Sequence, residues 1–241
     1  MLSGRGIVVG HQPGVPVLDG VDLSVAPGEV VGLAGPSGSG KSTLARVLGT
    51  LLAPWSGEVS VDGVPVTGVR YRVPRELRGT VGMVFQSPRL SVDARLTLAA
   101  VIAEPLRVPG TPTAGRRAAA LRERRVAELA ERVGLTADLL HRHPHEVSDG
   151  QLQRACLARA LAQRPRYLIC DEMTAMLDAS SAAALVAALR DDVATGQLGV
   201  LAISHDEDLL AAWADRTVRL TQAPAGGAAH RAAGAVAPGH W

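Results

Sequence analysis

The chain has 241 residues, of which 47% are hydrophobic and 20% are charged, and its formal net charge is +2. This composition suits a folded protein of one or two domains, argues against disorder of the whole chain, and favours neither an acidic nor a basic partner. No apolar run approaches the roughly 18 residues that cross a bilayer, and the start MLSGRGIVVG has no apolar signal core, so we expect a cytoplasmic chain without membrane spans.

The first part of the chain contains the patterns of short antiparallel strands. VDLSV (21–25) is followed by PGEVVGL (27–33), and GEVSVDGVPV (57–66) holds the pair Asp62-Gly63 between two apolar runs. Asp-Gly favours a tight hairpin turn, because both residue types tolerate a positive φ. We therefore expect an antiparallel β flank beside the main sheet.

Further along, short apolar runs alternate with segments of helical period. The predicted strands are VVGLAG (30–35), VGMVFQ (81–86), YLICDE (167–172) and VLAISH (200–205), and the clearest predicted helices are QLQRACLARALAQ (151–163) and SSAAALVAALRDDVA (180–194). This alternation is typical of an α/β protein with a mainly parallel sheet. Ligands of such sheets bind beyond the carboxyl ends of the strands, where polar residues follow these runs.

Residues from about 90 to 150 lack strong strand patterns and are predicted to form a helical insertion. Its arginine-rich segment (116–134) has an apolar stripe with charges on the other faces, which favours a solvated helix over a nucleic-acid patch. The predicted organisation is a single domain over 1–222, with a catalytic core at about 1–89 and 159–222 and a helical subdomain at about 90–158, and a flexible Ala/Gly/Pro-rich tail over 223–241.

The stretch GPSGSGKST follows a predicted strand, precedes the helical LARVLG, and fits the pattern G-x-x-x-x-G-K-[ST]. Glycines let the backbone wrap around a phosphate, and the start of the helix adds partial positive charge. The predicted nucleotide-binding residues are Gly35, Pro36, Ser37, Gly38, Ser39, Gly40, Lys41, Ser42 and Thr43. Lys41 is the one lysine of the chain. We predict that its compact ammonium binds the β- and γ-phosphates, where a planar guanidinium would fit poorly, and that Ser42 binds Mg²⁺.

A phosphate-binding loop alone is shared by kinases, GTPases and several classes of ATPase. The chain contains no asparagine, so the guanine-recognition pattern N-K-x-D is excluded. A second pair of candidate residues, Asp171 and Glu172, ends the apolar run YLIC. The aspartate can hold Mg²⁺ and the glutamate can polarise the attacking water. On their own, the two acids are equally typical of a strand that simply ends in charged residues.

The pattern VSDGQ (147–151) opens a predicted helix, and here the chain resembles the ATP-binding cassette (ABC) family of transporter ATPases, whose signature is LSGGQ. The resemblance covers about residues 5–220, with the motifs in the family's order, and implies a P-loop NTPase fold that binds ATP and Mg²⁺. By the family's pattern, the catalytic residues are Glu172, His205 and Gln86, the Mg²⁺ ligands are Ser42, Gln86 and Asp171, and further nucleotide contacts are Ser148, Gly150, Gln151, Asp178 and His11.

The resemblance also implies partners. In this family the signature helix covers the nucleotide on a second subunit, so Ser148 and Gly150 are expected to complete a site on another chain. The segments around Gln86 and the signature look like the peptide and nickel importer branch. This branch implies a second ATPase subunit, which is more often a homologous chain than a second copy of the same chain. It also implies two transmembrane permease subunits and, indirectly, an extracytoplasmic binding protein. The implied cargo is peptides or nickel and other metal chelates, and the implied place is the cytoplasmic face of the membrane, without nucleic acid.

Two other functions stay open at this point. A soluble ABC ATPase that acts on nucleic acid or ribosomes usually has two cassettes or a coiled-coil insertion, and this sequence shows neither. A small-molecule P-loop kinase would leave VSDGQ and His205 without a role.

The chain departs from the family pattern in three places. Asp149 replaces the usual glycine of the signature and would bring a carboxylate toward a γ-phosphate. We therefore expect slower ATP hydrolysis at the composite site, which is the site that two subunits form together. Residues 173–176 (MTAM) replace Pro-Thr-Ser-Ala in the segment that leads to Asp178. His11 stands where an aromatic residue usually stacks on adenine, and its imidazole offers a smaller face.

Two groups of residues contain potential metal ligands, and neither is predicted to bind a metal. The histidines of HRHPHE (141–146) match the family's ordinary lead into the signature. Cys156 and Cys170 lack the spacing of a zinc site and are expected to be buried thiols.

Overall fold

The computed structural model of the chain describes residues 1–106, 116–221 and 233–236. They belong to two compact units. The first unit comprises Met1–Met83, Arg166–Glu172 and Arg190–Trp241, and the second comprises Val84–Pro165 and Met173–Leu189. The second unit therefore takes in residues 173–189, which the sequence prediction assigned to the catalytic core.

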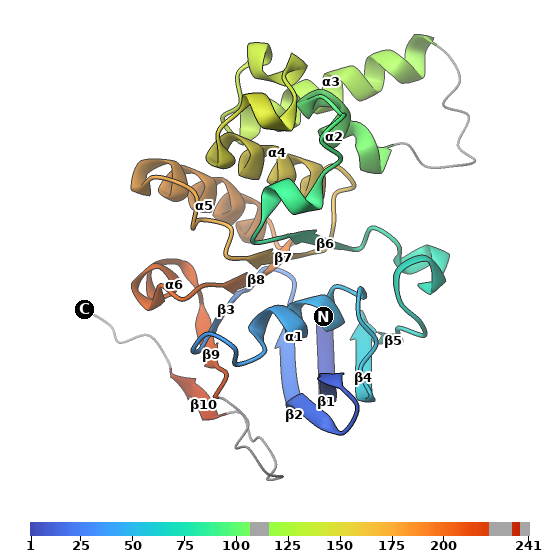
Figure 1. The fold of residues 1–241 in the computed structure, drawn as a ribbon, viewed down its shortest axis with the longest axis vertical. Helices are drawn as coiled ribbons and strands as arrows, with labels where there is room; N and C mark the ends of the chain where they lie inside the picture. Colours follow the sequence, from blue (N-terminus) through green and yellow to red (C-terminus); the bar gives the residue numbers. More distant parts are fainter. Residues whose placement is uncertain (107–115, 222–232, 237–241) are drawn as a thin grey trace. The chain divides into compact units, whose positions relative to one another are not determined.

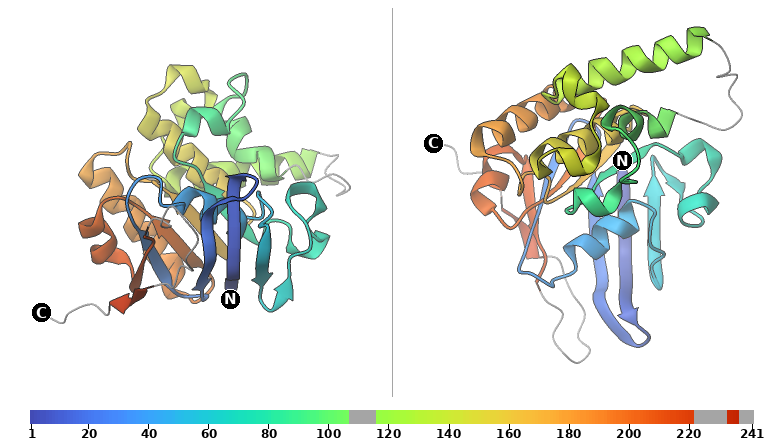
Figure 2. Two further views of the ribbon diagram at one scale, coloured as in Figure 1. Left: turned by 60° about the horizontal axis from the view of Figure 1, so that its bottom comes forward. Right: turned by 45° about the horizontal axis from the view of Figure 1, so that its top comes forward.

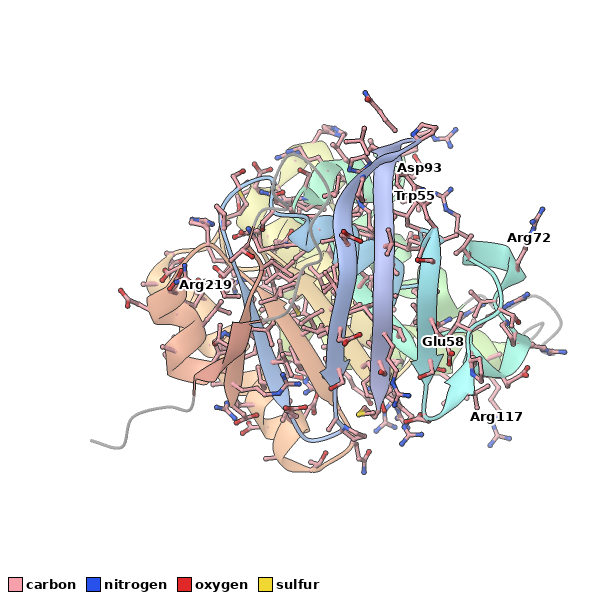
Figure 3. The ribbon with its side chains drawn as sticks, turned by 90° about the horizontal axis from the view of Figure 1, so that it is seen from below. Trp55, Glu58, Arg72, Asp93, Arg117 and Arg219 are labelled. Carbon is pink, nitrogen blue, oxygen red and sulfur yellow. The ribbon has the colours of Figure 1, made fainter. Side chains whose placement is uncertain are left out.

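The first unit contains a four-stranded antiparallel sheet in the order β2-β1-β4-β5. Its strands are β1 (Leu2–Gln12), β2 (Val15–Val25), β4 (Ser56–Val61) and β5 (Val64–Pro65). Asp62 and Gly63 join β4 to β5 with φ values of 52° and 79°, as predicted for an Asp-Gly hairpin. Trp55 precedes β4 and lies beside β1 (Figure 3), where a Cβ at Gly10 would come within 2.6 Å of its ring. The small residue at position 10 thus makes room for the tryptophan.

The second sheet has six strands in the order β10-β9-β3-β8-β7-β6. The strands are β3 (Val30–Ala34), β6 (Val81–Val84), β7 (Tyr167–Asp171), β8 (Gly199–Ile203), β9 (Arg216–Arg219) and β10 (Ala233–Val236). β3 pairs in parallel with β8 and β9, and β7 pairs in parallel with β8. β3, β7 and β8 are buried along their whole length, which explains their continuous apolar sequences. The predicted α/β class is confirmed, and the carboxyl ends of these three strands meet at one edge.

The core of the first unit lies between its two sheets, with helix α1 (Lys41–Leu48) packed into it (Figure 1). Leu44 and Leu48 of the helix are fully buried together with Ile7 of β1 and Leu33 of β3. Burial of each such side chain is worth roughly 1.5–3 kcal/mol. Because α1 begins at Lys41, this packing also fixes the end of the loop that precedes it. Helix α6 (Glu207–Trp213) packs against β3 and β9 of the same unit.

The second unit is mainly helical (Figure 2). It holds α2 (Leu98–Ala103), α3 (Arg116–Arg132), α4 (Asp149–Leu161) and the first part of α5 (Ala179–Ala194). α2, α3 and α4 pack on one another, and Ile102, Leu129 and Leu152 are fully buried. Short 3₁₀ turns lie at Arg70–Arg72 and Arg75–Leu77 in the first unit and at Pro88–Ser91, Glu104–Leu106, Ala137–His141 and Pro144–Glu146 in the second. Within the described ranges, no helix combines the length and apolarity that a bilayer span requires.

The predicted flexible tail, 223–241, is described only at Ala233–Val236, which form β10. This strand pairs antiparallel with β9, with Val236 opposite Thr217. The sequence did not predict this strand, because an open sheet edge offers backbone hydrogen bonds that need no side-chain periodicity. The rest of the predicted tail lies outside the described residues.

Candidate functional site

A glycine-rich loop leaves the buried strand β3 and enters α1. Gly35, Gly38 and Gly40 have φ values of 148°, 78° and 96°. A Cβ at Gly35 would lie 2.4 Å from the carbonyl oxygen of Leu220, and one at Gly40 would lie 2.5 Å from Cδ2 of Leu18. Only glycine therefore allows this path. No side chain caps the start of α1, so the first N–H groups of the helix remain open to an anion.

The side chain of Lys41 bends back over this loop. Its Nζ donates hydrogen bonds to the carbonyl oxygens of Gly35 (2.7 Å) and Pro36 (3.0 Å). Both acceptors are neutral, so the ammonium charge is held at the loop without being cancelled there. The hydroxyl of Ser39 is buried in the same loop without a hydrogen-bond partner. A cradle with one fixed cation and one unsatisfied hydroxyl suits a phosphate group.

Asp171 ends β7 and contacts Ser42, the residue that follows Lys41. Only 4% of Asp171 is exposed, and its Oδ1 is buried without a hydrogen-bond partner. Burial raises the pKa of the carboxyl, the hydrogen bond with Ser42 lowers it, and the neighbouring charge of Glu172 raises it again, so the net direction is upward. A buried carboxylate beside a hydroxyl is the oxygen-donor set that Mg²⁺ prefers, so the residues present fit this ion.

Glu172 follows in a strained conformation. Its φ is 53°, although it is not glycine, and its N–H donates to the carbonyl oxygen of Ile203 at 3.0 Å. Such a backbone costs roughly 1–3 kcal/mol and is concentrated at functional sites. Oε2 of Glu172 lies 2.9 Å from Nδ1 of His205, and the glutamate side chain is 10% exposed whereas that of the histidine is 75% exposed. The carboxylate of Glu172 therefore faces the imidazole of His205, which follows the neighbouring strand β8.

The signature segment starts α4 in the second unit. Oγ of Ser148 accepts from the N–H of Gln151 (3.2 Å), and Oε1 of Gln151 accepts from the N–H of Ser148 (3.0 Å). This reciprocal capping satisfies two donors at the helix start. A Cβ at Gly150 would lie 3.0 Å from the carbonyl oxygen of Met176, so a small residue lets the helix start approach the segment before Asp178.

A groove of about 500 Å³ lies within the second unit, and the signature forms one of its walls. Its lining includes Ser148, Asp149, Gly150, Met176, Leu177 and Asp178. Asp178 directly precedes α5, and its carboxylate accepts hydrogen bonds from the hydroxyls of Ser180 and Ser181 and from the N–H of Ser181. These bonds hold the pKa of Asp178 far below its usual range. The predicted signature and Asp178 are thus brought together on one surface.

The remaining predicted site residues are distributed over both units. Gln86 is exposed and belongs to the second unit, whereas Ser42 and Asp171 belong to the first, so the predicted Mg²⁺ set is divided between the units. His11 is exposed in β1 of the first unit. In the second unit, the carbonyl of Phe85 accepts a hydrogen bond from Nε2 of the buried Gln153 at 3.2 Å, which ties the chain just before Gln86 to α4.

Sequence reasoning missed Arg89. Its Nε lies 2.6 Å from Oδ1 of Asp149, and its Nη1 and Nη2 donate to the carbonyl oxygens of Pro144 (2.8 Å) and Val147 (3.2 Å). The one available signal was Asp149 itself, because a carboxylate at the usual glycine position calls for a nearby positive charge. The sequence offers many arginines and gives no means of choosing among them.

The histidine-rich segment before the signature forms a local cap. The rings of His143 and His145 stack with centroids 5.7 Å apart, and the N–H of His143 donates to Oε2 of Glu146 at 2.6 Å. Among the described residues, no group of three or more His, Cys, Asp or Glu side chains is arranged to hold a metal ion. Cys156 and Cys170 are both buried and free.

Comparison with known proteins links this arrangement to a family. A family profile described as "ABC transporter" matches residues 18–175. The methionine import ATP-binding protein MetN of Nocardia farcinica is 41% identical over 204 residues, which cover 85% of this chain and 58% of the relative. MetN of Caulobacter vibrioides is 41% identical over 212 residues, covering 87% and 60%. A protein of Brucella abortus named "Putative peptide import ATP-binding protein BAB2_1053" is 40% identical over 208 residues, covering 84% and 61%. The chain therefore spans about three fifths of the length of these relatives.

Solved structures of related proteins have a fold similar to that of this chain. The ATP-binding cassette MJ0796, described as a dimer in a post-hydrolysis state bound to ADP and Pi, aligns with a TM-score of 0.79 and 26% identity over 92% of this chain and 96% of that chain. CbiO1 of Clostridium perfringens, described as part of the transporter complex CbiONQ, aligns with a TM-score of 0.75 and 25% identity over 92% and 86%.

Proposed function

The chain belongs to the ABC transporter family, and on this premise we propose that it is the ATP-hydrolysing subunit of a membrane importer. One observation carries the proposal: the Lys41 cradle, the contact between Ser42 and Asp171, and the pair Glu172–His205 all lie within the first unit, at the carboxyl edge of the parallel sheet. A phosphate site, a cation site and a carboxylate that can act on water are thereby assembled.

Phosphate binding rests on the loop. The ammonium of Lys41 and the uncapped N–H groups of α1 would hold the phosphates of ATP, and the free hydroxyl of Ser39 supports a ligand at the same place. Ser42 and Asp171 would hold Mg²⁺, with Gln86 as a further proposed ligand. When bound, Mg²⁺ supplies positive charge that neutralises the phosphate oxygens.

Water activation rests on Glu172. Its buried carboxylate is fixed by the turn after β7 and by the imidazole of His205, so it is held in one orientation. We assign it the task of orienting the attacking water and accepting its proton. His205 keeps Glu172 in place and, being mostly exposed, can also contact the γ-phosphate. Stabilisation of the charge that develops during phosphoryl transfer is the main source of catalysis in such sites.

The signature supplies the other half of the site. Ser148, Gly150 and Gln151 line a groove of the second unit together with Asp178, and we propose that this surface covers ATP bound to a partner ATPase. The similarity to a cassette described as dimeric with ADP and Pi supports this arrangement. His11 is proposed to contact adenine. ATP would then close the dimer, and hydrolysis would reopen it.

For the cargo, the relatives favour methionine. The reported relatives at 41% identity are named for methionine import, so we propose methionine in place of the nickel chelates expected from sequence. Peptides remain a second candidate, because a relative at 40% identity is named for peptide import. In this proposal, the chain works at the cytoplasmic face of the membrane with a second ATPase subunit, two permease subunits and an extracytoplasmic binding protein.

The test is transport by the assembled importer in vesicles, with the chain co-expressed with permease subunits that co-purify with it. ATP-dependent uptake of labelled methionine, abolished by Lys41→Ala, is the expected result. Uptake of labelled peptides alone would select the second candidate. Recovery of the chain on ribosomes or nucleic acid, without membrane subunits, would overturn the importer in favour of a soluble ABC ATPase.

A further inference from the structure

We propose that Arg89 is a positioning residue which clamps the signature loop and neutralises the carboxylate of Asp149, so that the loop can approach a phosphate. This inference rests on the proposed function, because the phosphate is that of ATP on a partner subunit. It replaces the expectation that Asp149 slows the composite site.

The clamp consists of three contacts from one guanidinium. Nη1 donates to the carbonyl oxygen of Pro144, which lies before the signature, and Nη2 donates to that of Val147, the first signature residue. Nε faces Oδ1 of Asp149 at 2.6 Å. All of these residues belong to the second unit. The planar guanidinium thus donates two hydrogen bonds and makes one ion pair from three different nitrogens, which the single nitrogen of an ammonium cannot do with the same geometry. Arg89 therefore sets the path by which the chain enters α4.

The charge of Asp149 needs this partner. Its Oδ1 is shielded from solvent and, among the described residues, has no hydrogen-bond partner, so the adjacent guanidinium is what compensates it. The start of α4 adds a smaller favourable field, because Asp149 is the first residue of the helix. About half of each side chain is exposed (47% and 46%), so salt partly screens the pair.

The position of Asp149 explains why its pairing with Arg89 matters for the approach to a partner's ATP. Asp149 stands between Ser148 and Gly150, the two signature residues proposed to face the partner's ATP, and it lines the same groove. A bare carboxylate at this place would repel the γ-phosphate, since like charges that meet at an interface weaken association. The Arg89–Asp149 pair presents no net charge. The loss of Arg89 should therefore harm assembly far more than the loss of Asp149, and removing both should restore it.

The first measurement concerns the chain without nucleotide. Hydrogen exchange of the amides in 149–152 is compared between the parent chain, Arg89→Met, Arg89→Lys and Arg95→Met. Arg95 is a matched control, because it pairs with Asp93 at 2.7 Å in the same unit. We expect Arg89→Met to speed this exchange roughly tenfold, Arg89→Lys to restore part of the protection, and Arg95→Met to change nothing. Unchanged exchange in Arg89→Met would overturn the clamp.

The second measurement is ATP-driven dimerisation by sedimentation, in the Glu172→Gln background to prevent turnover. We expect Arg89→Met to weaken dimerisation roughly tenfold or more, and Arg89→Met with Asp149→Gly to return to within about threefold of the parent. A double variant as weak as Arg89→Met would show that Arg89 does not act through Asp149. If the parent itself does not respond to ATP, pairing of two copies of this chain fails, and the exchange measurement still decides the clamp.

Discussion

Oε2 of Glu172 lies 2.9 Å from Nδ1 of His205, and the two residues follow neighbouring parallel strands, β7 and β8. The carboxylate is largely buried and the imidazole is exposed, so the pair joins the interior of the first unit to the surface where a nucleotide would lie. The positive φ of Glu172 comes at a cost in backbone energy. This strained turn and the contact with His205 are the observations on which the proposed catalytic role of Glu172 rests.

The first prediction concerns this histidine. His205→Ala should lower kcat for ATP hydrolysis by roughly 10²-fold, because Glu172 loses its orienting partner, while ATP binding changes less than about threefold. Steady-state kinetics together with calorimetry separate the two effects. His141→Ala, at an exposed histidine of the second unit, is the control and should behave as the parent. A fall in ATP affinity with an unchanged kcat would assign His205 to binding instead.

The second prediction concerns the single lysine. Lys41→Ala should weaken ATP binding roughly 10- to 150-fold, because a charge-assisted hydrogen bond is worth about 1.5–3 kcal/mol. Lys41→Arg should not restore binding, since the guanidinium is too broad for the loop whose carbonyls now accept the ammonium. Calorimetry with ATP and Mg²⁺ measures both. Equal affinity in Lys41→Ala and the parent would contradict the assignment.

Local sequence patterns predict some parts of this site and not others. The phosphate loop and the strand that ends in Asp171 were predictable, because glycine spacing and apolar runs report local structure directly. The contact of Arg89 with Asp149 was not, since it joins a 3₁₀ turn to a helix start 60 positions away in the chain and many arginines could serve. The strained turn at Glu172 was also missed, because glutamate carries no signal for a positive φ. β10 was missed because its pairing depends on an open sheet edge.

The third prediction is that Asp171 lowers the stability of the fold although it is needed for function. Burial raises its pKa, so the ionised carboxylate disfavours folding at neutral pH and this penalty fades as the pH falls through the folded-state pKa. Asp171→Asn should therefore raise the melting temperature without ligand by about 2–4 °C, the shift that about 1 kcal/mol produces in a chain of this size. The difference from the parent should be largest at neutral pH. ATP with Mg²⁺ should stabilise the parent and not the variant. Calorimetric scans at several pH values check this, and a variant that is less stable at neutral pH would contradict it.

The fourth prediction concerns Asp62 in the β4–β5 turn. Burial raises its pKa, but the N-terminal ammonium, Tyr167 and Arg166 outweigh burial and lower it. Tyr167 donates to Oδ1 at 2.5 Å and Arg166 donates to Oδ2 at 2.6 Å. The stability that this carboxylate provides is present above its unfolded-state pKa and is lost as the pH falls through the lower folded-state value. Asp62→Asn should cost about 1–3 kcal/mol at neutral pH and little in acid.

Chemical denaturation at neutral and acid pH measures the effect at Asp62. Asp191→Asn, at an exposed carboxylate of α5, is the control and should change the free energy of unfolding by less than about 0.5 kcal/mol. An Asp62→Asn variant that matches this control at neutral pH would show that the turn does not depend on the carboxylate.

The central claim is that Glu172 activates water in an ATP-hydrolysing site, and the most direct test is turnover by Glu172→Gln measured beside its ATP affinity. The amide keeps the size of the side chain and a contact with His205, but it cannot accept a proton from water. We predict a loss of turnover of roughly 10²- to 10⁴-fold, with ATP binding retained. Near parental ATPase activity in Glu172→Gln would contradict this role for Glu172.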